Sequence, residues 1–100
     1  RPQGFRDGAH KGTTTCWPSG LTVAATWDVV AAKMWGDAMG VEFVAKGANV
    51  MLGPALNVIR LPQNGRGFEY LSGEDPQIGA TLGPEVIRAV QAHGILANAK

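Results

Sequence analysis

Charged and amide side chains gather between residues 54 and 77 of the sequence. There Arg66 lies between two glycines, with Glu69 three residues further on. Small neighbours leave a guanidinium room to approach a ligand closely, and its planar fork donates paired hydrogen bonds. Glu69 is placed to orient that fork. The alternative is that Arg66 is a solvated loop side chain, and these residues alone leave both interpretations open.

Further side chains could contribute to such a binding site. Lys100 follows an apolar segment, which suits either a buried aliphatic stem with a solvated amine or a ligand contact at the mouth of a sheet. Phe68 and Tyr70 could stack on a sugar ring, although aromatic residues in loops more often anchor the core. Glu74 and Asp75 precede a predicted helix, so capping is their better interpretation.

The sequence lacks the motifs of several other kinds of functional site. The glycines around Arg66 lack the third glycine of a dinucleotide-binding turn, and neither Ser19 nor Ser72 lies in a nucleophile elbow. The single cysteine, Cys16, is far in sequence from both histidines, which argues against a local zinc motif and favours a structural thiol. The sequence therefore predicts no metal and no cofactor.

Composition limits the class of protein. The 100 residues are 45% hydrophobic, and nine Lys and Arg against eight Asp and Glu give a formal net charge of +1. This hydrophobicity argues against disorder, and the balanced charge argues against a basic nucleic-acid arm. No apolar run is long enough to span a membrane. We therefore expect one globular domain, or part of one, that binds neither nucleic acid nor a membrane.

The first part of the chain predicts loop, strand and helix, in that order. The glycine-rich start reads as loop, and residues 21–26 as a short buried strand. A helix is predicted over residues 29–46 with Asp28 as its N-cap, and Gly36 and Gly40 inside it are expected to serve close packing. Its apolar residues recur on one face: Val30, Met34, Ala38, Val41 and Ala45.

The second part predicts a strand over residues 48–52, a long loop, a helix and a strand over residues 95–99. About twenty residues of loop inside a compact domain usually mark a functional segment. The helix begins near residues 75–76 or near residues 83–84 and ends near His93.

This alternation favours parallel β-α-β units with both faces of the sheet covered. In such folds functional residues follow the carboxyl ends of strands, where the long loop and Lys100 both lie. Trp17, Trp27 and Trp35 are expected to pack in or beside the core. The last residues are apolar, where native termini are usually polar, so we expect a piece of a longer protein.

Several motifs, taken together, resemble glycoside hydrolase family 3, the retaining β-glucosidase type. Residues 65–76 are similar to the family's G-R-x-F-E-Y-x-S-E-D-P, with Gly73 as an extra residue. Residues 52–58 resemble its L-G-P-x-x-N-I, residues 21–28 its L-x-x-A-A-T-W-D, and residues 1–6 the tail of its D-G-P-x-G-x-R. The final Asn98-Ala99-Lys100 resembles the start of its V-K-H-F strand, and the motifs follow the family's order.

The resemblance implies an α/β fold: a partial (β/α)8 TIM barrel of about three consecutive βα units, with residues 1–100 in the N-terminal catalytic domain. It implies a retaining β-glucosidase that acts on terminal non-reducing β-D-glucosyl residues of a β-glucoside or oligosaccharide. The Phe68-Glu69-Tyr70 sequence favours the glucosidases. The alternatives are a related β-xylosidase or β-N-acetylglucosaminidase, or a non-catalytic carbohydrate-binding relative. A secreted or periplasmic location is implied by the family alone.

By the same resemblance, Arg66 and Lys100 match residues that donate to sugar hydroxyls in the subsite for the non-reducing glycosyl unit, and Glu69 supports Arg66. The family's nucleophile Asp and acid/base Glu have no counterpart in the sequence, so no catalytic residue is assigned. The resemblance thus implies that these 100 residues are inactive alone and act with the remainder of the barrel and a following domain.

Overall fold

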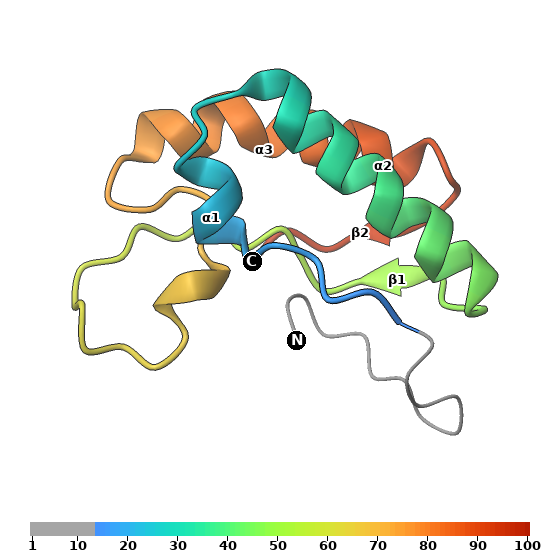
Figure 1. Cartoon of the computed structure of the whole chain (residues 1–100), viewed down its shortest axis with the longest axis horizontal. Coiled ribbons are helices and arrows are strands. Elements are labelled where there is room, and N and C mark those ends of the chain that lie inside the picture. The colour runs from blue at the N-terminus through green and yellow to red at the C-terminus, as the bar shows by residue number, and fades with distance from the viewer. Residues whose placement is uncertain (1–13) are drawn as a thin grey trace.

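The computed structural model describes residues 14–100, so the motif at residues 1–6 and His10 lie outside the described part. Two long helices lie side by side over one face of a two-stranded sheet (Figure 1). The elements, in chain order, are α1 (Gly20–Ala24), α2 (Val29–Ala45), β1 (Val50–Met51), the 3-10 turn η1 (Gly67–Glu69), α3 (Pro76–Gln91) and β2 (Leu96–Ala97).

The two strands are parallel, as predicted for an α/β fold. Val50 lies opposite Leu96 and Met51 opposite Ala97. Because α3 connects the strands, β1, α3 and β2 form one β-α-β unit. Residues 14–100 thus contain one complete β-α-β unit, which α2 precedes. Regular strand pairing covers only two residues within each predicted strand, at 50–51 and at 96–97.

The prediction of a strand over residues 21–26 is wrong, because these residues form α1 and the turn after it. The Ser19 hydroxyl accepts the N–H of Thr22 at 3.2 Å, and the Ser19 carbonyl accepts the N–H of Val23 at 3.0 Å. These local bonds satisfy backbone groups that a strand would have to pair with a neighbour. A short apolar run has no periodicity that distinguishes the two outcomes.

Helix α2 has the predicted N-cap but a different core face. The Asp28 carboxylate accepts the N–H groups of Val30 and Ala31 at 2.8 and 3.3 Å. However, Val30, Met34 and Val41 of the predicted apolar face are 64%, 66% and 53% exposed. The helix is apolar on several sides, so periodicity did not single out the buried one. That side carries Ala32, Trp35, Gly36, Met39, Gly40 and Phe43.

Helix α3 begins at the earlier of its two predicted starts. Asp75 caps it by accepting the N–H of Gln77 at 2.8 Å, which confirms the capping role expected of Asp75. Pro76 occupies the first turn, where its missing N–H costs no intrahelical bond. Pro84 therefore lies inside the helix.

Close packing of α2 against α3 depends on two glycines, as predicted. A Cβ on Gly36 would lie 2.8 Å from the carbonyl oxygen of Val86, and one on Gly40 would lie 2.4 Å from Cδ2 of His93. The Nε2 of His93, just after α3, lies 2.7 Å from Oδ1 of Asp37 on α2. At Gly36 the obstructing atom belongs to the backbone of α3, so a larger side chain there would force the helices apart, whereas at Gly40 the His93 ring would have to move.

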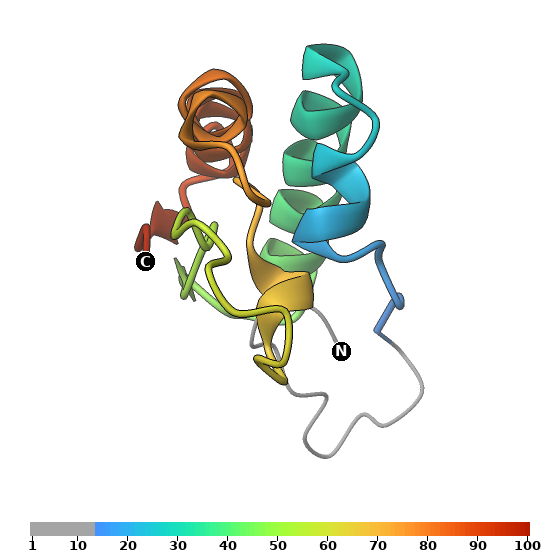
Figure 2. The same cartoon turned by 90° about the vertical axis from the view of Figure 1, so that its left-hand side faces the viewer.

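The core lies between the helices and the sheet (Figure 2). Within the described residues the opposite face of the strands is open, so both-sided coverage is not observed: Val50, Leu52 and Leu96 are 44%, 56% and 58% exposed. The largest fully buried side chains include Met51, Leu71, Leu82, Val86 and Val90.

The three tryptophans differ in their surroundings. Trp35 is buried and its Nε1 donates to the carbonyl of Pro18 at 3.0 Å. Trp17 packs against the core and donates to the Glu42 carboxylate at 2.8 Å. Trp27 is 74% exposed, which corrects the prediction that it packs in or beside the core. It lies in the turn between α1 and α2 with a φ of 55°, and this turn leaves the indole in solvent.

Cys16 is exposed, so the prediction of a structural thiol is not supported. No helix within residues 14–100 combines the length and apolar character needed to cross a membrane.

Candidate functional site

The loop after β1 returns to the carboxyl end of β2. The N–H of Leu56 donates to the carbonyl of Lys100 at 2.5 Å, and the N–H of Lys100 donates to the carbonyl of Pro54 at 3.1 Å. The N–H of Leu71 donates to the carbonyl of Ala55 at 2.8 Å, which draws the far part of the loop to the same place. The turn η1 and the end of the chain are thereby brought together.

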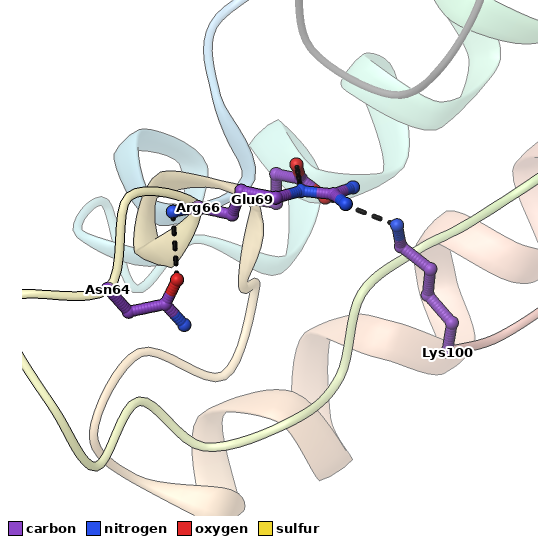
Figure 3. Close-up of polar contacts among 4 residues, drawn as sticks. All are labelled: Asn64, Arg66, Glu69 and Lys100. Carbon is purple, nitrogen blue, oxygen red and sulfur yellow. Dashed lines mark hydrogen bonds and ion pairs between the residues drawn. The ribbon is translucent and has the colours of Figure 1, made fainter.

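The three predicted site residues form one charged cluster there (Figure 3). Nε and Nη2 of Arg66 lie 2.5 and 2.9 Å from the two carboxylate oxygens of Glu69, a bidentate geometry. Nζ of Lys100 lies 3.2 Å from Oε2 of the same carboxylate. One carboxylate thus holds two cations from segments on either side of α3.

Exposure differs across this cluster. The side chain of Glu69 is 12% exposed, whereas those of Arg66 and Lys100 are 66% and 38% exposed. The Glu69 carboxylate is therefore largely covered, whereas Arg66 and Lys100 present N–H donors to the outside. A Cβ on Gly65 would meet no atom of residues 14–100 within 4 Å, so the described part of the chain leaves the space beside that glycine open.

The charges in the cluster support one another. Hydrogen bonds from Arg66, and then from Lys100, hold the pKa of Glu69 below its ordinary value against the opposing effect of burial. The hydrogen bond to Glu69 raises the pKa of Arg66. Glu69 and Arg66 are therefore both charged at neutral pH. A carboxylate occupied in this way is unsuited to act as a nucleophile or as a general acid.

Asn64 fixes the backbone that carries Arg66, a role that was not predicted from the sequence. Its Oδ1 accepts the N–H of Arg66 at 2.9 Å, and its carbonyl accepts the N–H of Gly67 at 3.2 Å. Its own N–H donates to the carbonyl of Leu61 at 3.0 Å. An Asn two residues before the positioned residue is the signal of such a turn.

The remaining candidates near the cluster separate into structural and accessible residues. Ser72 is buried and its hydroxyl donates to the carbonyl of Leu56 at 2.6 Å, so it fastens the loop. Phe68 is 44% exposed, and Tyr70 is half-buried. The arrangement as a whole can bind oxygen-rich groups through two cationic donors.

The sequence matches the model of the glycosyl hydrolase family 3 N terminal domain over residues 3–100. Among curated proteins, beta-glucosidase B of Emericella nidulans is 41% identical over 101 residues, which cover 99% of this chain and 12% of that protein. Beta-glucosidase A of Aspergillus kawachii is 43% identical over 100 residues, which cover 99% of this chain and 11% of that protein. The chain thus spans about an eighth of these relatives or less.

Solved structures agree with the sequence matches. Beta-glucosidase 3B from Thermotoga neapolitana, in complex with alpha-D-glucose, superposes with a TM-score of 0.80 at 33% identity, covering 96% of this chain and 13% of that chain. The same enzyme in complex with glycerol gives a TM-score of 0.77 at 32% identity, covering 93% of this chain and 14% of that chain.

Proposed function

Because this chain belongs to glycoside hydrolase family 3, as its motifs predicted, we propose that residues 1–100 are part of the N-terminal catalytic domain of a retaining β-glucosidase. The full-length enzyme removes terminal non-reducing β-D-glucosyl residues from β-glucosides or oligosaccharides. Arg66 and Lys100 bind the glycosyl unit, and Glu69 holds both cations in place.

The observation that carries this proposal is the pair of cations on one largely covered carboxylate, at the carboxyl ends of parallel strands. Glu69 accepts from Nε and from one Nη2 hydrogen of Arg66, so the remaining Nη1 and Nη2 hydrogens can donate to two neighbouring hydroxyls. The Lys100 ammonium can donate to a third. Glu69 fixes the spacing between these donors before the sugar arrives. Such preorganisation lowers the entropy cost of binding the ring in one orientation.

These residues position the sugar and do not break the bond. Retaining hydrolysis needs two carboxyl groups about 5 Å apart, one of which attacks the anomeric carbon while the other acts first as acid and then as base. We assign both groups to other parts of the full-length enzyme, because Glu69 is committed to its two cations. Hydrogen bonds from Arg66 and Lys100 that tighten as the ring distorts would contribute to catalysis.

We further propose that β1, α3 and β2 are consecutive parts of a (β/α)8 barrel. The parallel pairing and the single helix-covered face support this arrangement. Side chains alternate along an extended chain, so Lys100 shares a face with Asn98 and with the exposed Leu96. In a barrel this face lines the interior, which covers Leu96 and directs Lys100 towards the mouth.

The test is hydrolysis by the purified full-length protein of three aryl glycosides: the β-glucoside, the β-xyloside and the β-N-acetylglucosaminide. We expect the glucoside to be preferred and the first product formed to retain its β configuration, as observed by NMR. We expect the 100-residue piece alone to be inactive. Preference for another glycoside would reassign the substrate, and binding without hydrolysis would indicate a non-catalytic relative.

A further inference from the structure

Ser72 carries a buried hydroxyl in the segment that follows η1. The residue is 1% exposed, and within residues 14–100 no other hydroxyl, amide or charged side chain is as deeply buried. A hydroxyl removed from water costs free energy unless it is hydrogen-bonded. The bond from Oγ of Ser72 to the carbonyl of Leu56, at 2.6 Å, meets this need. Movement of Leu56 away from Ser72 would break that bond inside the protein, so the two residues are held together.

Two glycines of α3 make the space in which this bond forms. A Cβ on Gly79 would overlap the Ser72 hydroxyl and lie 2.9 Å from the Cβ of Ser72. One helical turn further, a Cβ on Gly83 would lie 3.0 Å from Cδ2 of Leu56. Both partners of the hydrogen bond are therefore seated against the same face of α3, which leaves either of them little room to shift.

Leu56 connects this buried bond to the charged cluster. Its N–H donates to the carbonyl of Lys100 at 2.5 Å, and the N–H of Lys100 donates to the carbonyl of Pro54 at 3.1 Å. From that backbone, Nζ of Lys100 reaches to 3.2 Å from Oε2 of Glu69. One short segment, residues 54–56, is thus bonded to Ser72 and to the residue that supplies the second cation of the site.

We propose that Ser72 is a positioning residue: through Leu56 and the backbone of Lys100 it sets the place of the Lys100 ammonium beside Glu69 and the bound glucosyl unit. The lysine stem has four rotatable bonds, so its ammonium is well placed only if the backbone that carries it is fixed. A misplacement of about 1 Å can lower a rate by about a hundred-fold. This inference rests on the proposed β-glucosidase function and adds to it a residue that acts through the backbone.

The test is a double-mutant cycle in the full-length enzyme, with 4-nitrophenyl β-D-glucoside as the substrate. Ser72→Ala removes the hydroxyl, and Lys100→Met removes the ammonium but keeps the backbone and an unbranched side chain. We expect Ser72→Ala to lower kcat/KM by about five-fold when Lys100 is present. In the Lys100→Met background the same change should lower it by less than about two-fold, because no ammonium is left to misplace.

Thr81→Val is the matched control for the loss of a hydroxyl. The Thr81 hydroxyl also donates to a carbonyl, that of Gln77 at 2.8 Å, but on the exposed side of α3. This variant should stay within about two-fold of its parent in both backgrounds. Ser72→Cys, whose thiol is a weaker donor, provides a second variant if Ser72→Ala folds poorly, and it should show the same dependence on Lys100.

The outcomes separate a positioning role from a structural one. A loss that depends on Lys100 supports the proposal, whereas equal losses in both backgrounds, or no loss in either, overturn it. If Lys100→Met alone left kcat/KM unchanged, Lys100 would not bind the glucosyl unit and the inference would be refuted with that role. Failure of the unmodified enzyme to cleave the aryl glucoside would instead refute the proposed function.

Discussion

Nζ of Lys100 lies 3.2 Å from Oε2 of Glu69, although all of α3 separates the two residues in the sequence. The contact follows from the β-α-β unit, which returns the chain to the same edge of the sheet. Backbone hydrogen bonds of Lys100 with Leu56 and Pro54 also hold the loop against the end of the chain. Glu69 is therefore the point at which loop and strand end are tied together beside the open space of the site.

We expect Glu69→Gln to reduce the catalytic efficiency of the full-length enzyme much more than it reduces the stability of the fold. Gln keeps the size of the side chain but loses the charge that holds Arg66 and Lys100. Both cations would then sample more orientations, so kcat/KM on the aryl glucoside should fall by about ten-fold or more. The measurement is steady-state kinetics together with the melting temperature.

The matched control for this change is Glu85→Gln. Glu85 also pairs with an arginine three residues away, Arg88, but on the surface of α3. Arg88 is 69% exposed and Glu85 28%. A single ion pair at the surface contributes little, so kcat/KM should stay within about two-fold. Equal kinetic effects of the two substitutions would contradict a special role for Glu69.

The stabilisation that Glu69 provides should depend on pH. Its pKa is lower in the folded protein than in the unfolded chain, because Arg66 and then Lys100 favour the carboxylate. The stabilisation is therefore complete above the unfolded value of about 4.3 and is lost as the pH falls through the lower folded value.

We expect the difference in melting temperature between the unmodified protein and Glu69→Gln to be constant from neutral pH down to about pH 5 and to shrink below it. Melting curves from pH 7 to pH 3 measure this difference. A difference that grows on acidification would refute the assignment of a lowered pKa.

Arg66→Ala should lower kcat/KM by about ten-fold or more, because the variant loses charge-assisted hydrogen bonds to sugar hydroxyls. Arg66→Lys should also be impaired, since an ammonium cannot reproduce the bidentate fork that meets Glu69. If Arg66 were only a solvated loop residue, both variants would stay within about two-fold of the unmodified enzyme. Kinetics at matched melting temperatures separate these outcomes.

The site was more predictable than the elements around it, for a physical reason. Arg66 and Glu69 lie three residues apart, so their pairing needs only a single turn, here η1. Lys100 could be placed near them because the carboxyl ends of parallel strands share an edge. Asn64 was missed as a positioning residue because the sequence shows the amide but not which backbone N–H it accepts.

Two features of the fold could not be predicted from local pattern. Residues 21–26 are mostly apolar without a clear period, and local bonds such as those to Ser19 form a helical turn there. In α2 the stripe with Val30 and Met34 is as apolar as the side with Met39, so burial is decided by which side meets α3 and the sheet. Tertiary contacts, not periodicity, select the face.

Gly36→Ala should destabilise the protein even though alanine favours a helix. The new Cβ would lie 2.8 Å from the carbonyl oxygen of Val86, a backbone atom that can move only with α3. Overpacking of this kind costs about 1–3 kcal/mol, which outweighs the gain of about 1 kcal/mol in helix propensity when the backbone resists. Gly65→Ala, whose Cβ meets open space, should leave the melting temperature unchanged. A higher melting temperature in Gly36→Ala would contradict the packing argument.

Finally, we expect Asn64 to affect activity through the backbone of Arg66. Asn64→Ala removes the acceptor of the Arg66 N–H, whereas Asn64→Asp keeps an oxygen in the same place. The alanine variant should therefore lower kcat/KM on the aryl glucoside by about three- to ten-fold, and the aspartate variant should recover most of it. Gln63→Ala changes the exposed amide directly before it, so it is the matched control and should stay within about two-fold on this substrate. A purely structural role would lower the melting temperature of Asn64→Ala without this rescue pattern in the kinetics, so equal activity of the two Asn64 variants would refute the positioning role.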